Sequence, residues 1–274
     1  DEMNLARVEH YFADFLSALE SGEPLNLHDS AQVEEGLSEG DEQETPVPRS
    51  LRIPPNVFFL GTVNVDESTY LFSPKVLDRA FTIELNSVDL EGLATGIERG
   101  GELVLDHWNG RLDPPPRPGR PDWKWLVDRE EGALAAEVQA FHGLLARHNR
   151  HFGYRVATEL ARFVRLAAEQ AKEPGPAAWA ALDLALLEKV LVKLHGTRHE
   201  LATILNSLLR LTLVGASGDD VLSELSLWTY VPEEAVVRRK DEVADLDAVF
   251  PRSAAKLWRM QDRLRETGFT SWIE

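Results

Sequence analysis

Apolar residues recur at helical spacing at the start of the chain and form a short continuous run further along. The first pattern ends at Gly22 and predicts a helix, because residues three and four apart share one helical face. Its apolar members are Leu5, Val8, Phe12, Phe15, Leu16 and Leu19. The second pattern, Val57–Val63, follows two prolines and indicates a strand buried on both faces of a parallel sheet.

Three further elements extend this alternation of helix and strand up to residue 90. Phe81–Leu85 is a shorter strand candidate, and the sheet it forms with Val57–Val63 is expected to expose apolar residues along an open side. Ser73 followed by Pro74 predicts a short helix over residues 74–80, because serine caps helices and proline fits their first turn. Residues 25–28 and 49–53 are predicted to pair as a β-hairpin.

After residue 125 the apolar pattern is helical throughout and predicts a helical bundle. Pro251 is predicted to open its last helix. The stripes are Val156, Leu160, Phe163, Val164 and Ala167; Leu182, Leu186, Leu187, Val190, Leu191 and Leu194; Leu201, Leu205, Leu208 and Leu211 or Thr212; and Leu257, Met260, Gln261 and Leu264. We interpret these residues as core.

Two segments of unusual composition divide the chain. Residues 29–44 carry seven acidic residues and no Lys or Arg, so they are predicted to form a mobile loop. Residues 113–121 hold five of the fifteen prolines and are typical of an extended connector. We place the domain boundary near residue 90, with domains 1–90 and 91–274.

Composition narrows the function classes. No apolar run approaches the length of a bilayer span, and no targeting signal is present at the start, so we expect a soluble cytoplasmic chain without membrane contact. The absence of Cys excludes disulfides, thiolate metal sites and a cysteine nucleophile. A net charge of −17 disfavours tight nucleic-acid binding by this surface alone.

Candidate chemistry comes from the order of polar residues around the predicted strand. An acidic pair, Asp1 and Glu2, opens a helix; in nucleotide hydrolysis one carboxylate can hold Mg²⁺ while a second polarises water. Asn64 ends the central strand and could orient that water, and Arg79 ends the following helix and could reach a phosphate across a subunit interface.

These residues carry a family resemblance. DEMNLA resembles the Walker B segment of AAA+ ATPases, GTVN their sensor-1 strand and SPKVLDRAF their arginine-finger helix, in the branch of MoxR-like and McrB-type (methylcytosine-restriction) motors. FGYR at residues 152–155 is similar to the start of the sensor-2 helix, and LEKVLVKLHGTRHEL and PRSAAKLWRMQDRL resemble the tail of McrB-like sequences. The resemblance implies an α/β fold: the C-terminal half of an AAA+ αβα core with parallel strands, followed by an all-α lid subdomain, predominantly helical overall.

Residue roles follow from the resemblance. It assigns Asp1 to Mg²⁺ coordination, Glu2 to water activation, Asn64 to sensor 1, Arg79 to the trans-acting finger and Arg155 to sensor 2. It implies ATP or GTP with Mg²⁺ as the bound species. The expected assembly is a homo-oligomeric ring, a hexamer, that acts on a protein or DNA substrate through other parts of the assembly.

One departure from the family matters. No G-x-x-x-x-G-K-[ST] stretch occurs, so these 274 residues lack the loop that cradles phosphates, and we expect this chain alone to be inactive. The hypothesis is therefore a part of an ATPase motor whose Walker A segment lies upstream. Two alternatives stay open: an ATP- or GTP-driven motor subunit of a DNA restriction system, and a non-catalytic interaction module. The sequence leaves open which nucleotide is used, which substrate is remodelled, and whether the chain is a fragment.

Overall fold

The computed structural model describes residues 1–28, 47–54, 56–64, 70, 72–85, 118–213 and 248–273. They belong to two units, which we describe separately. The first unit contains the described residues up to Arg79 together with Glu84 and Leu85, and the second contains Ala80–Ile83 and the described residues from 118 onward. The boundary predicted near residue 90 and the acidic segment 29–44 lie outside the described residues.

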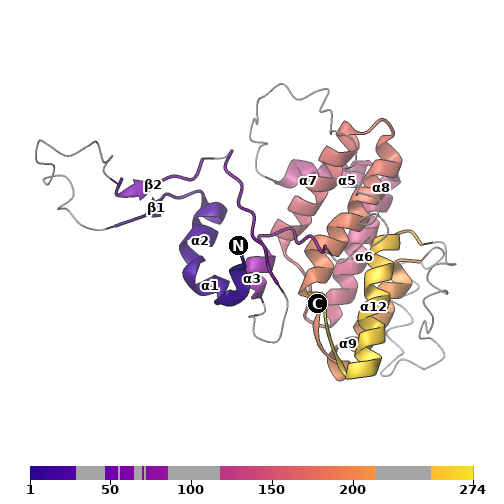
Figure 1. The fold of residues 1–274 in the computed structure, drawn as a ribbon. Helices are drawn as coiled ribbons and strands as arrows, with labels where there is room; N and C mark the ends of the chain where they lie inside the picture. Colours follow the sequence, from indigo (N-terminus) through magenta and orange to yellow (C-terminus); the bar gives the residue numbers. More distant parts are fainter. Residues whose placement is uncertain are drawn as a thin grey trace, which may run out of the picture. The chain divides into compact units, whose positions relative to one another are not determined.

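The first unit consists of short elements (Figure 1). They are η1 (Met3–Leu5), α1 (Val8–Tyr11), α2 (Ala13–Ser21), β1 (Leu25–Asn26), β2 (Ser50–Leu51) and α3 (Pro74–Leu77). The predicted first helix is confirmed in part, since it breaks at Phe12 and ends at Gly22, which has the left-handed φ of 73° that glycine tolerates. Leu5 and Leu19 of its stripe are exposed.

A small apolar core holds the first unit together. Val8, Leu16 and Val76 are buried, with Met3, Phe12 and Phe72 packed against them. The predicted hairpin is confirmed, because β1 and β2 pair antiparallel with Leu25 opposite Leu51. The predicted helix at Pro74 is also confirmed, although it ends at Leu77.

The predicted parallel sheet requires a correction. Val57–Val63 and Phe81–Leu85 are in no strand, and every strand pair among the described residues is antiparallel. Phe58 and Leu60 are 66% and 96% exposed, whereas a strand buried on both faces would be covered at these positions. A strand buried on both faces needs neighbours that supply hydrogen bonds and cover. Within the described residues this run receives a backbone hydrogen bond from Met3 at Thr62, and ring contacts from Phe12 and Phe15 at Phe59, but no strand pairs with it.

The second unit is a helical bundle and confirms the predominantly helical expectation (Figure 1). Its elements are α5 (Arg120–Asp128), η3 (Glu130–Gly132), α6 (Ala133–Arg147), α7 (Tyr154–Gln170), α8 (Pro174–Ala185), the π-helical turn η4 (Leu186–Val190), the 3-10 turn η5 (Leu191–Lys193), β3 (His195–Thr197), α9 (Arg198–Leu211), α12 (Pro251–Thr267) and β4 (Phe269–Ser271). The connector predicted to run to residue 121 is shorter, since α5 begins at Arg120.

The predicted stripes form the core of this bundle. α7 packs against α5 and α8, and α9 packs against α6 and α12. The buried members of the stripes include Val156, Leu160, Val164, Leu182, Leu186, Val190, Leu191, Leu194, Leu201, Leu205, Leu208, Leu257, Met260, Gln261 and Leu264. β3 and β4 pair antiparallel beside the bundle. None of the described helices combines the length and the apolar character that a bilayer span requires.

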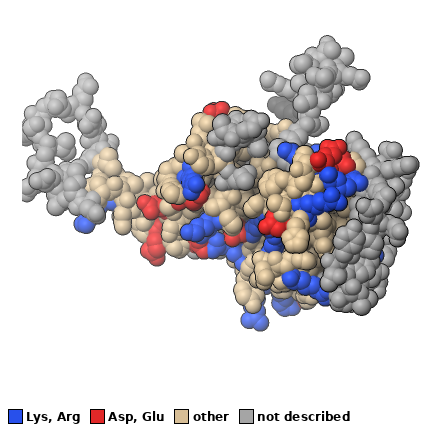
Figure 2. Space-filling model, turned by 90° about the horizontal axis from the view of Figure 1, so that it is seen from below, with Lys and Arg blue, Asp and Glu red and all other residues tan. Residues whose placement is uncertain are grey.

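Charge is unevenly distributed over the described surface. The exposed side of α12 carries Arg252, Arg259 and Arg263. Figure 2 shows Lys and Arg side chains gathered in groups among Asp and Glu on the face that it draws. That face is therefore not uniformly acidic, although the net charge of the chain is −17.

Candidate functional site

Residues 1–4 lie beside residues 62–64 in the first unit. The backbone N–H of Met3 donates to the carbonyl oxygen of Thr62 at 2.9 Å, and the side-chain amide of Asn4 donates to the carbonyl oxygen of Asn64 at 2.7 Å. Asn4 is buried, so this bond satisfies a donor that water does not reach. The contacts bring two segments with a sequence separation of about sixty residues into one cluster.

Glu2 and Asn64 are in direct contact within this cluster. The Asn64 side-chain amide donates to Glu2 Oε1 at 2.9 Å, and the Glu2 backbone N–H donates to the Thr62 hydroxyl at 3.0 Å. Glu2 has φ 47° and ψ 50°, a left-handed conformation that is unfavourable for a residue with a side chain. The bond that Glu2 donates to Thr62 and the bond that it accepts from Asn64 hold Glu2 in that conformation and fix one oxygen of its carboxylate.

Asp1 is held by the same threonine. The Thr62 hydroxyl donates to Asp1 Oδ1, and the side chains of both residues are exposed. A carboxylate is a suitable ligand for Mg²⁺, which usually keeps several waters and takes one or two protein carboxylates together with substrate phosphates. The described residues contain no group of three or more His, Cys, Asp or Glu that could hold a metal by themselves. Asp1 therefore fits a magnesium site whose other ligands are waters and substrate phosphates, but not a site built from protein ligands alone.

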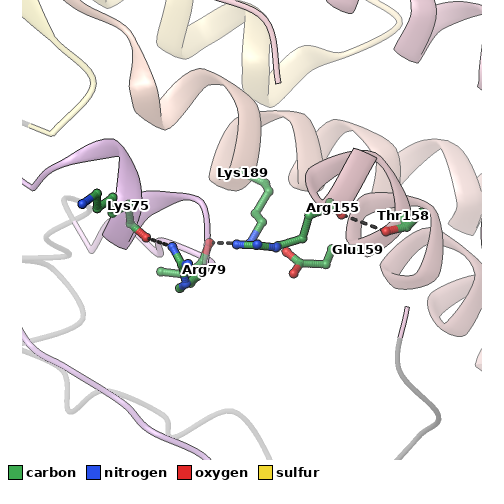
Figure 3. A network of polar contacts seen from close by, with 7 residues as sticks. Lys75, Arg79, Arg155, Thr158, Glu159 and Lys189 are labelled. Carbon is green, nitrogen blue, oxygen red and sulfur yellow. Dashed lines mark hydrogen bonds and ion pairs between the residues drawn. The ribbon is translucent and has the colours of Figure 1, made fainter. Parts of the chain in front are cut away.

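Arg79 follows α3 and is held elsewhere in the first unit. Its guanidinium forms an ion pair with Glu20. It also donates to the carbonyl oxygen of Lys75 at 2.7 Å (Figure 3). Its Nε is buried and has no hydrogen-bond partner among the described residues. The guanidinium thus lies near the end of α3 and is held there by two contacts.

Arg155 is the second residue of α7 and belongs to the second unit. It is half-buried, and its backbone carbonyl accepts a hydrogen bond from the Thr158 hydroxyl at 2.9 Å (Figure 3). The role as sensor 2 stays a prediction. Of the five predicted site residues, Asp1, Glu2 and Asn64 are brought together, and Arg79 and Arg155 are held by other contacts.

The sequence reasoning did not single out Thr62, Asn4 or Gly61. Thr62 contacts both members of the acidic pair, and its signal was a hydroxyl inside an otherwise apolar run. Asn4 contributes through burial, which spacing does not show. A Cβ on Gly61 would lie 1.8 Å from the Met3 sulfur, so glycine at this position permits the close approach of the two segments.

The helical part of the chain defines its class: a small all-α domain closed by a two-stranded antiparallel sheet. Residues 122–269 match the model of a family described as a domain of unknown function, DUF8727. The match covers more than half of the chain, so the chain belongs to this family. No curated protein and no solved structure matches the chain significantly. The family match lies in the helical unit and does not include Asp1, Glu2, Asn64 or Arg79.

Proposed function

We propose that this chain carries part of a nucleoside-triphosphatase site of the AAA+ type, with ATP as the nucleotide, in a ring-forming motor of the MoxR-like or McrB-type branch. The observation that carries the proposal is the hydrogen bond between Asn64 and Glu2 at 2.9 Å. A water-activating carboxylate and the amide that orients it must be neighbours, and these two residues are neighbours despite a sequence separation of 62.

Each residue of the cluster has a chemical role in this proposal. Glu2 accepts the proton of the attacking water, and Asn64 holds the Glu2 carboxylate in position. Asp1 would hold Mg²⁺, which supplies charge neutralisation at the phosphates. Thr62 orients both acidic residues through its hydroxyl. Arg79 would supply positive charge to a neighbouring subunit's site, where charge develops in the transition state.

The proposal also requires parts that these 274 residues do not supply. The sequence has no phosphate-binding loop, so the nucleotide needs a loop from outside these residues. The finer fold, a parallel αβα core, belongs to the same proposal. Val57–Leu60 exposes apolar side chains, and a strand of such a core would cover them with neighbouring elements.

The test uses subunits that carry a phosphate-binding loop. Glu2→Gln should retain nucleotide binding and lose turnover by about 100-fold or more, because it removes the proton acceptor but keeps the hydrogen bond to Asn64. Glu23→Gln is the matched control, because it removes a carboxylate from an exposed position of the same unit. Equal turnover in both variants would contradict the role of Glu2.

A second candidate function is a non-catalytic interaction module. The exposed apolar run at residues 57–60 favours it, since Phe58 and Leu60 are 66% and 96% exposed. Contiguous exposed apolar side chains mark interaction surfaces. Two results together would favour this module over the motor. Cells that carry Glu2→Gln would keep the normal function of the protein, and no assembly of the chain would hydrolyse nucleotide.

A further inference from the structure

A buried lysine of the helical unit holds the chain directly after Arg79. Lys189 lies on the π-helical turn η4, and its side chain is only 1% exposed. Its ammonium lies 2.6 Å from Glu159 Oε2 and donates to the carbonyl oxygen of Ala80 at 3.0 Å (Figure 3). It also lies 4.9 Å from the centroid of the Phe81 ring. A buried ammonium is costly unless it is paired and hydrogen-bonded, and these three partners meet that requirement.

The segment that Lys189 holds is Ala80–Ile83, which belongs to the helical unit. The backbone N–H of Thr82 donates to the carbonyl oxygen of Glu188 at 3.3 Å, and the Phe81 ring lies 5.3 Å from that of Phe163. Three successive residues are therefore bound by η4 and α7.

The division between the two units falls between Arg79 and Ala80. Arg79 itself is bonded to Glu20 and to the Lys75 carbonyl in the first unit. One peptide bond thus joins the candidate finger to a backbone segment that the helical unit holds. A shift of the bound carbonyl must be absorbed by the few dihedral angles between Ala80 and α3.

We propose that Lys189, together with Glu159, is a positioning pair for Arg79: it fixes the carbonyl of Ala80 and couples the helical domain to the placement of the finger. This inference rests on the proposed function. π-helical turns are rare and are frequent at functional sites, which agrees with a role for η4 beyond packing. Sequence position alone could have drawn attention to Lys189, because it lies three residues after Leu186 on an apolar stripe.

A positioning role and a purely structural role make different predictions in mixed assemblies. Arg79→Ala subunits keep Glu2 but lack the finger, whereas Glu2→Gln subunits keep the finger but cannot turn over. Turnover in a mixture then comes from the sites of Arg79→Ala subunits, each completed by the finger of a neighbouring Glu2→Gln subunit. If Lys189 positions the finger, its substitution lowers turnover only when it is in the subunit that donates the finger. If Lys189 is purely structural, its substitution lowers turnover equally in either kind of subunit.

The experiment places Lys189→Met in one kind of subunit at a time, in subunits that carry a phosphate-binding loop. In the Glu2→Gln subunit it should lower the kcat of the mixture about 10-fold or more with KM unchanged, because small misplacements of a catalytic group cost this much. In the Arg79→Ala subunit it should leave kcat within about twofold. Lys124→Met, which removes a lysine from an exposed pair with Asp128, is the control in both placements.

A second readout does not depend on turnover. Hydrogen exchange of the Thr82 amide, followed by mass spectrometry, should accelerate at least about 10-fold in Lys189→Met, because local opening releases a bond held only by the docked segment. An unchanged exchange rate would overturn the inference. If Lys189→Met subunits do not fold, Glu159→Gln takes their place, since it removes the anion of the same pair while keeping its shape.

The outcomes separate the inference from the proposed function. No turnover in a mixture of Arg79→Ala and Glu2→Gln subunits that carry an intact Lys189 would overturn the trans-acting finger, and the inference with it. Turnover can also recover in the mixture while Lys189→Met lowers that turnover equally from either kind of subunit, or from neither. Both of these results would overturn the inference and leave the proposed function standing. Sensitivity only in the finger-donating subunit would support both.

Discussion

Asp183 caps a helix to which it does not belong, and its removal should cost more stability than any exposed substitution. The last helix, α12, begins with Pro251, which has no N–H, and is preceded by Phe250, whose side chain cannot cap. Asp183 on α8 supplies the missing acceptors. Its Oδ2 accepts from the N–H of Arg252 and its Oδ1 from that of Ser253, both at 2.9 Å.

The magnitude follows from burial. Asp183 is 2% exposed and Ser253 is fully buried, so water cannot easily replace the carboxylate. Two unsatisfied N–H groups cost about 1–3 kcal/mol each, and the loss of an anion at a helix N-terminus costs about 0.3–1 kcal/mol more. We expect Asp183→Ala to lower the free energy of unfolding by about 3–5 kcal/mol. Asp183→Asn keeps one acceptor oxygen and should cost about half as much.

The assay is urea denaturation followed by far-UV circular dichroism, with thermal melting as a second measure. A loss of about 3 kcal/mol should lower the melting temperature by about 6–12 °C for a chain of this size. Asp128→Ala, at an exposed position on α5, is the control and should change stability by less than about 0.5 kcal/mol. A cost for Asp183→Ala below about 1 kcal/mol would refute the argument, because it would mean that the two N–H groups find other acceptors.

Three further predictions concern backbone conformation, pH and nucleotide. Gly268 ends α12 with φ 79° and has open space around a Cβ, so Gly268→Ala should cost about 1 kcal/mol from backbone strain alone. Gly153→Ala, at φ −90° and also with open space around a Cβ, carries no such strain and should cost less in the same denaturation assay. Hydrogen bonds from the Thr197 backbone and hydroxyl lower the pKa of Glu200. The contribution of Glu200 to stability should therefore be present above about pH 4.3 and lost as the pH falls through the lowered pKa. Glu200→Gln should flatten the dependence of the free energy of unfolding on pH in that acidic range, and an unchanged dependence would contradict this. Calorimetric titration of these 274 residues with Mg-ATP or Mg-GTP should give no saturable binding at micromolar concentrations, and saturable binding would argue against a half-site.

The helical half could be predicted from the sequence because its signal is local. The stripe through Leu182, Leu186 and Val190 repeats at the helical period, and each helix satisfies its own backbone hydrogen bonds while it buries such a stripe against other helices. Caps within one segment, such as Thr197 with Glu200, are equally local. The hairpin of β1 and β2 was also predictable, since its two strands flank one acidic segment.

The strands could not be predicted in the same way, because a strand is completed by residues elsewhere. Val57–Val63 has the composition of a buried strand, but no strand among the described residues pairs with it, and Phe58 and Leu60 are exposed. The sequence therefore determined which residues are apolar and not whether they are buried.

The same distinction between local pattern and tertiary structure applies to the candidate site. The sequence alone identified Asp1, Glu2, Asn64 and Arg79 as residues of the right chemistry, through their order and a family resemblance. Only the tertiary structure decided that Asn64 contacts Glu2, that Asp183 caps α12, and that Lys189 holds Ala80. These pairings join residues that are far apart in the chain. Asp183 and Lys189 are buried, so their partners are fixed by packing and by the cost of leaving a buried polar group unpaired. The exposed pair of Glu2 and Asn64 is fixed by the approach of two distant segments. A local pattern contains neither kind of information.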